Sequence, residues 1–388
     1  MTTARPRSRS RALRLDAPEL DAAIASAERD AVVMWRGEPI PFADLPARIA
    51  RTDGRAERDG IYAGWIEALE AINPQYETRL AFWREQVAGT GADDAITALA
   101  GGRDVEALSL DLEQMAVATE TVFFAALRRY LALIDIEQGD ATLADLWHVT
   151  QGAAWAHWFG GRDLDRAAAD TGRTIQPDAH GNGWRSAEVG LIGPIAGRSV
   201  SAAAVSEVYG TLVGDPAWLG SALRMATDEI SSFADFVAFV RIWRLRRLLA
   251  MTQFELRLYR SEESAVQRAY FSGIVGYATG VVVPEAAYLH DVGSPFSSVT
   301  DIERTMLAGA IGTTVEQRFG AEWWTDERAT QLLAELGAAS SSQDLLAQLG
   351  YDGLDWRPVV RQIRTRLIGE MSGYGGPNIT TRAGTRKV

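Results

Sequence analysis

The sequence has no cysteine and a single lysine, Lys387, close to its end. The absence of cysteine excludes disulfides and thiolate metal sites. With Lys387 alone, no lysine is available within a folded core to form a Schiff base or to bind phosphate. No apolar run reaches the ~18 residues of a membrane-spanning helix, so no membrane span is expected.

Negative charge dominates: 51 acidic residues face 39 basic ones, which gives a formal net charge of −12. This surplus repels nucleic acid and anionic lipid, so neither is an expected partner. The 47% hydrophobic content is enough to bury a core. Residues 1–15 are rich in arginine and serine but lack the apolar segment of a secretory signal. We interpret them as a disordered arm and expect a cytoplasmic protein.

Apolar residues recur at helical spacing along most of the chain, which predicts an all-α, mainly helical fold with little or no β-structure. Ser231 and Asp326 are candidate N-caps for two of the helices. The periodicity predicts helices over residues 58–72, 104–135, 229–260, 300–319 and 327–337.

The periodicity fails in two places. Residues 171–200 contain six glycines and two prolines, so we expect an irregular insertion that lies over a cleft and is the most mobile internal segment. Residues 369–388 are predicted to form a turn-rich tail. No linker divides the rest, and residues 16–368 are therefore interpreted as a single helical domain with a cleft.

Several segments, in the same order along the chain, resemble the thimet oligopeptidase and oligoendopeptidase F group of metallopeptidases. These segments are residues 55–83, 214–219 (GDPAWL), 236–259, 288–291 (YLHD) and 319–324 (FGAEWW). The resemblance covers roughly residues 55–365 and implies a helical scaffold around a central cleft.

The metallopeptidase chemistry needs HExxH on a helix, in which two histidines one turn apart bind zinc and the glutamate is the general base. The matching segment is residues 145–152, DLWHVTQG. His148 stands at the first ligand position, whereas Val149 replaces the base and Gly152 the second histidine. Ala203, or Glu207 one turn later, corresponds to the third ligand. The resemblance therefore implies a protein with neither metal nor cofactor.

The same scaffold implies which side chains line the cleft. His148 lies on the first element and Glu207 on the second, while Tyr277, Tyr288 and His290 come from the wall opposite. Tyrosine can donate to a developing anion, and glutamate or histidine can move a proton. We predict these five as catalytic residues. A cluster of arginines at residues 241–247 is interpreted as a solvated helix face, although part of it could hold an anion.

Two functions follow from this reasoning. The first is a metal-independent enzyme that acts on a small molecule in a specialised biosynthetic pathway, by ring closure, elimination or group transfer. The alternative is a non-catalytic pseudo-peptidase that binds a peptide or a partner subunit in the cleft. An active zinc peptidase is a third reading, which the loss of the zinc ligands disfavours.

Overall fold

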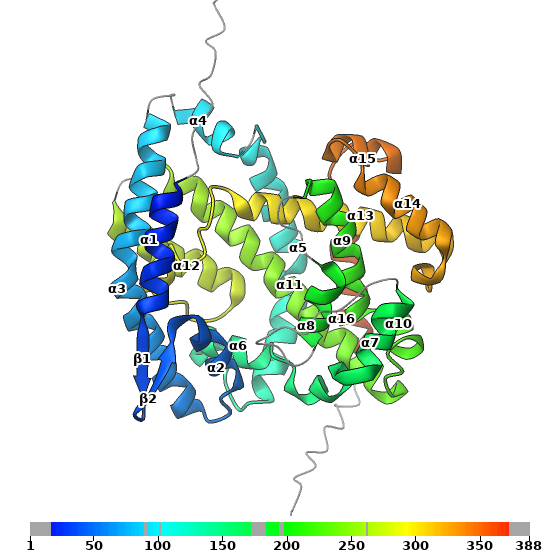
Figure 1. Cartoon of the computed structure of the whole chain (residues 1–388), viewed down its shortest axis with the longest axis horizontal. Helices are drawn as coiled ribbons and strands as arrows, with labels where there is room; N and C mark the ends of the chain where they lie inside the picture. Colours follow the sequence, from blue (N-terminus) through cyan, green and yellow to red (C-terminus); the bar gives the residue numbers. More distant parts are fainter. Residues whose placement is uncertain are drawn as a thin grey trace, which may run out of the picture.

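Helices make up nearly all of the regular structure, and the predicted all-α class is confirmed (Figure 1). The computed structural model describes residues 17–88, 92–100, 102–171, 184–193, 198–260 and 263–371. The predicted arm lies wholly outside this part of the chain, as does the predicted tail apart from residues 369–371.

The N-terminal elements end with a long helix and a short one. They are α1 (Pro18–Asp30), β1 (Val32–Trp35), β2 (Glu38–Pro41), η1 (Phe42–Asp44), α2 (Leu45–Arg51), α3 (Arg55–Ala88) and α4 (Ala92–Leu99). The middle of the chain contributes α5 (Val105–Ala132), η2 (Gln138–Asp140), α6 (Leu143–Val149), η3 (Ala153–Phe159), α7 (Gly161–Asp170), α8 (Trp184–Ile192), α9 (Val200–Thr211), η4 (Leu212–Gly214) and α10 (Pro216–Ser221). The C-terminal part holds α11 (Thr227–Leu258), α12 (Ser264–Thr279), η5 (Glu285–Ala287), α13 (Ser297–Phe319), η6 (Trp323–Thr325), α14 (Glu327–Gly337), α15 (Ser342–Leu349) and α16 (Arg357–Met371).

A small antiparallel hairpin, β1–β2, is covered on one face by α3. Its register pairs Trp35 with Glu38, and Val33 and Trp35 point towards the helix. Gly60 and Gly64 of α3 make this approach possible, because a Cβ on Gly60 would lie 2.0 Å from the Trp35 ring. The two strands have four residues each, which is too short for a strong alternating pattern, so the apolar periodicity does not reveal this hairpin.

Helix α11 runs through the centre of the molecule and contacts α5, α12, α13 and α16 (Figure 1). Buried side chains surround it, so it is a core helix and not an amphipathic surface helix. It begins at Thr227, and Ser231 is therefore an interior residue and not its N-cap. Asp326 does cap α14, where its carboxylate accepts a hydrogen bond from the Arg328 amide at 2.8 Å.

The buried apolar side chains form one connected cluster that extends from Ile24 to Leu367. Contributions come from the N-terminal, middle and C-terminal elements. No helix in the described ranges is both long and apolar enough to cross a bilayer.

The predicted irregular insertion needs a correction. Helix α8 occupies residues Trp184–Ile192, inside the range expected to lack regular structure. Trp184, Ala187 and Leu191 of this helix are buried, and α8 packs against α9. The glycine content of the range concealed this short apolar stripe. Residues 172–183 and 194–197, which make up about half of the range expected to lie over the cleft, are outside the described residues.

One buried carboxylate on α11 makes stability depend on pH. Glu255 accepts hydrogen bonds from the Phe296 amide at 2.6 Å and the Ser298 hydroxyl at 2.8 Å, close to the start of α13. Burial raises the pKa of Glu255 from its ordinary 4.5 to about 7, although these hydrogen bonds act in the opposite direction. Between pH 4.5 and about 7, the folded protein therefore keeps a proton on Glu255 that the unfolded chain has released.

We expect Glu255→Gln to remove a pH-dependent loss of stability. Between pH 4.5 and about 7 the folded state binds more protons at Glu255 than the unfolded state, so the free energy of unfolding falls as pH rises. The full fall is roughly 3 kcal/mol. Urea denaturation of both proteins at pH 5 and pH 8 measures the difference. Equal pH dependence in the two proteins would show that Glu255 ionises normally.

Candidate functional site

The helix that carries His148 is too short to form a zinc motif. Helix α6 ends at Val149, and Gly152 lies beyond it in the left-handed conformation, with φ 67°. Trp184 and Phe236 crowd that glycine, since a Cβ there would lie 2.8 Å from each ring. A side chain in the position of the second histidine therefore has neither the helical geometry nor the room that HExxH requires.

His148 itself is tied to the backbone of α2. Its Nδ1 lies 2.8 Å from the carbonyl oxygen of Ala50, and α6 packs against α2. Within the described ranges, no three histidine, aspartate or glutamate side chains gather in a way that could hold a metal ion. The local geometry makes His148 a link between two helices.

We predict that the purified protein holds well under one equivalent of zinc. The reason is chemical, because Val149 and Gly152 supply neither a general base nor a ligand atom. Inductively coupled plasma mass spectrometry of protein purified without chelator measures the metal content. Stoichiometric zinc that disappears in His148→Ala would contradict the prediction.

Three of the other predicted site residues have partners of their own. Tyr277 is 64% exposed and donates to Glu120 at 3.3 Å. Tyr288 is buried, and its hydroxyl donates to Glu77 of α3. Nδ1 of His290 lies 3.2 Å from the Tyr76 hydroxyl, and its ring packs edge-on against Trp65 and Phe42.

A cavity of about 280 Å³ lies beside α11. Helices α8, α9, α11, α13 and α16 form its walls. Glu207 lines it, but His148, Tyr277, Tyr288 and His290 do not. The five side chains therefore do not all line this cavity, and their catalytic role stays a prediction.

Arg241 differs from the other arginines of this cavity in its hydrogen-bond partners. Its Nη2 donates to the carbonyl oxygen of Gly210 at 3.0 Å. Its other guanidinium nitrogens have no acceptor among the described residues, and Arg241 lines the cavity. Gly214 lies beside the head group, and a Cβ there would lie 3.4 Å from Nη1 but only 2.7 Å from the side chain of Val237. Burial lowers the pKa of Arg241, while the nearby carboxylate of Glu188 raises it.

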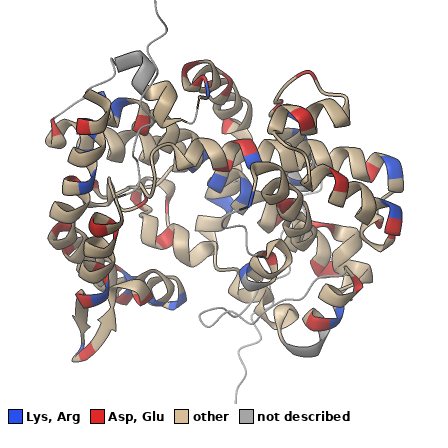
Figure 2. Cartoon of the chain, turned by 45° about the horizontal axis from the view of Figure 1, so that its top comes forward, with Lys and Arg blue, Asp and Glu red and all other residues tan. Residues whose placement is uncertain are grey.

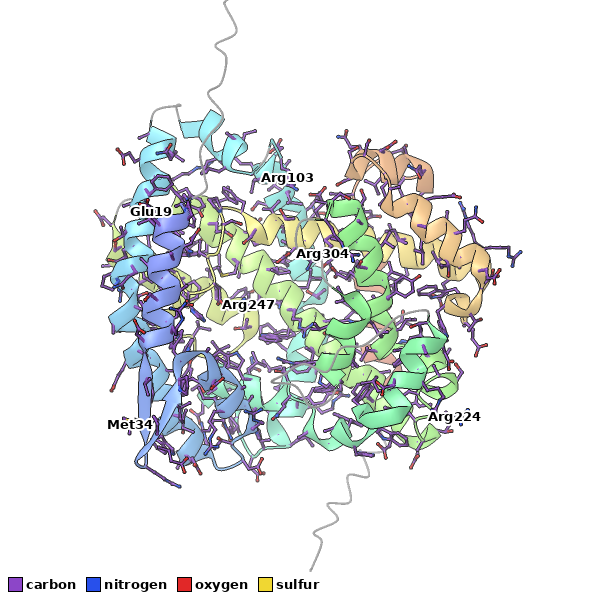
Figure 3. All side chains as sticks on the ribbon, in the orientation of Figure 1. Glu19, Met34, Arg103, Arg224, Arg247 and Arg304 are labelled. Carbon is purple, nitrogen blue, oxygen red and sulfur yellow. The ribbon has the colours of Figure 1, made fainter. Side chains whose placement is uncertain are left out.

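The remaining cavity arginines are paired with carboxylates. Arg244 binds Glu188 at 2.7 Å, and Arg304 binds Glu207, which also accepts from Thr305. Figure 3 marks Arg304 where α9 and α13 meet. Arg366 lies 4.0 Å from Asp215. These pairs leave Arg241 as an arginine of the cavity wall with no ion-pair partner among the described residues.

The arginines at residues 241–247 do not form a solvated face. Figure 2 shows basic positions gathered near the middle of the molecule. Arg246 is 1% exposed and donates to the carbonyl oxygens of Ala278 and Ala116. Arg247 pairs with Asp291. The sign of these buried arginines in the sequence was the presence of four arginines within seven residues of a largely apolar segment. Because α11 is surrounded by other helices, each arginine finds its partner on a different neighbour.

The cavity can bind an anion. A guanidinium with free donors binds a carboxylate or a phosphate through paired hydrogen bonds, and the partial burial of Arg241 strengthens such contacts.

The sequence matches no protein-family model, and no curated protein matches it either. The relation to the metallopeptidases stays a prediction from the motifs.

Proposed function

We propose that the cavity binds a small organic molecule through a carboxylate or similar anionic group held by Arg241. The observation that carries this proposal is the partly buried guanidinium, which has a single backbone acceptor and no carboxylate partner in the described structure. A buried charge is costly unless it is paired. A ligand anion supplies the missing partner.

The size and lining of the cavity favour a small molecule over a peptide. Its 280 Å³ lies near the lower end of small-molecule pockets, which span about 300–1,000 Å³. One part of the wall is apolar and suits a hydrocarbon body: Ala234, Ala238, Leu245, Leu248, Ala308, Val359 and Ile363. A bound peptide needs an extended groove, and no observation here supports the peptide-binding alternative.

Metal-independent chemistry on this ligand is the second part of the proposal. Arg241 would stabilise negative charge that develops on the anionic group it holds during an elimination or a group transfer. Glu188 and Glu207 are carboxylates of the cavity wall whose charges act on Arg241, and a carboxylate can accept a proton. This arrangement supports an enzyme that acts on a small molecule, in the kind of biosynthetic step that the sequence suggests.

Filling the cavity tests the proposal. Gly312 lines the cavity, and a Cβ there would meet only the Gln362 amide nitrogen, at 3.9 Å, so valine at this position takes cavity space. We expect Gly312→Val to weaken binding of small organic acids at least ~10-fold in isothermal titration calorimetry. The melting temperature should change little, because valine is a better helix former than glycine.

Gly273→Val is the matched control. Gly273 also lies inside a helix, α12, and a Cβ there meets nothing within 4 Å. The control should keep the affinity of the unmodified protein. Equal affinity of Gly312→Val and the unmodified protein for every organic acid that binds would contradict the location of the site.

A further inference from the structure

The cavity also presents a carboxylate oxygen. Glu188 of α8 is 6% exposed and binds Arg244 through Oε2 at 2.7 Å. Its other oxygen, Oε1, accepts no hydrogen bond from any described residue, and Glu188 lines the cavity. The cavity wall therefore offers free donors at Arg241 and a free acceptor at Glu188.

We propose that the ligand is an amino carboxylic acid, whose carboxylate binds Arg241 and whose ammonium group binds Glu188. The inference rests on the proposed function, that is, on an organic anion bound at Arg241. It adds the class of the ligand: a zwitterion with an apolar side chain, which the apolar wall of the cavity accommodates.

The charges of the wall favour a zwitterion over a dianion. Arg241 is balanced by one carboxylate of the ligand. A second negative charge on the ligand would lie among the carboxylates of Glu188, Glu207 and Asp215, and like charges repel each other. An ammonium group placed beside Glu188 gains from the same field.

Matched probes separate the two ends of the ligand. Calorimetric titrations use L-leucine, 4-methylpentanoate, which lacks the amino group, and 2-hydroxy-4-methylpentanoate, which replaces it by a hydroxyl. L-Leucinamide lacks the carboxylate. We expect L-leucine to bind at least ~10-fold more tightly than either acid, and leucinamide to bind more weakly than L-leucine by at least the same factor.

Substitution of the acceptor gives the second arm. Glu188→Gln should reduce the preference for L-leucine over 4-methylpentanoate to less than ~3-fold, because the amide has lost the negative charge. Glu303→Gln is the matched control, since Glu303 pairs with Arg103 at the same 2.7 Å and does not line the cavity. The control should keep the full preference.

The possible results distinguish the two proposals. Equal binding of L-leucine and 4-methylpentanoate overturns the amino-acid inference and leaves the anion site at Arg241 standing. Equal binding of the hydroxy acid and L-leucine assigns a hydroxyl to the ligand and also overturns the inference. If no carboxylate probe binds, or if leucinamide binds as well as L-leucine, the proposed function fails together with the inference.

Discussion

Asp145→Asn is expected to lower the free energy of unfolding by about 3–5 kcal/mol, which is the usual cost of removing one partner from a buried ion pair. Arg58 and Asp145 are 1% and 0% exposed, and Nη2 of Arg58 lies 2.7 Å from Oδ1 of Asp145. The other oxygen, Oδ2, accepts from the amide and hydroxyl of Thr142 at the start of α6. The asparagine variant leaves a buried guanidinium without its counter-charge.

Denaturant unfolding followed by circular dichroism measures this effect, with Glu70→Gln as the control. Glu70 pairs with Arg268 at the same 2.7 Å but is 48% exposed, so its loss should cost less than about 1 kcal/mol. A change below 1 kcal/mol for Asp145→Asn would mean that the carbonyl oxygens of Thr52 and Asp53, which Arg58 also contacts, suffice to hold the buried charge.

Arg241→Gln is expected to weaken binding of organic acids by about 100-fold or more, since truncating one partner of a buried charged contact costs 2–5 kcal/mol. The fold should tolerate the change, because Arg241 has a single protein acceptor, the Gly210 carbonyl. Isothermal titration calorimetry gives the affinity, and a thermal melt checks that the variant is folded.

Arg247→Gln is the control for this substitution. Arg247 lies on the same helix and pairs with Asp291 outside the cavity. Its variant should bind organic acids as the unmodified protein does. A similar loss of affinity in both variants would indicate a general effect of positive charge on α11 and would contradict a specific role for Arg241.

The helical fold was accessible from the sequence because it rests on local patterns. The periodic apolar residues of α5, α11, α13 and α14 predicted helices close to those observed, and Asp326 was recognisable as a cap. Ser231 misled because a serine before an apolar run resembles a cap, whereas α11 starts one turn earlier with Asp228 and Glu229 in its first turn.

The site was less accessible because it depends on packing between distant segments. Four different helices contribute to it the charged side chains Glu188, Glu207, Arg241 and Arg304. Their spacing along the sequence does not indicate that they lie close together. The motif comparison selected His148 and His290, which the structure places against Ala50 and Tyr76. The alternative interpretation of the arginine cluster, anion binding, is the one that the cavity geometry supports.

The most direct test of the account is a crystal structure of the protein grown with the organic acid that binds most tightly in calorimetry. The account predicts a carboxylate within hydrogen-bond distance of the Arg241 guanidinium, with the body of the ligand against Leu245, Leu248 and Ile363. A ligand bound beside His148 or His290, or on the outer surface with the cavity unchanged, would contradict it.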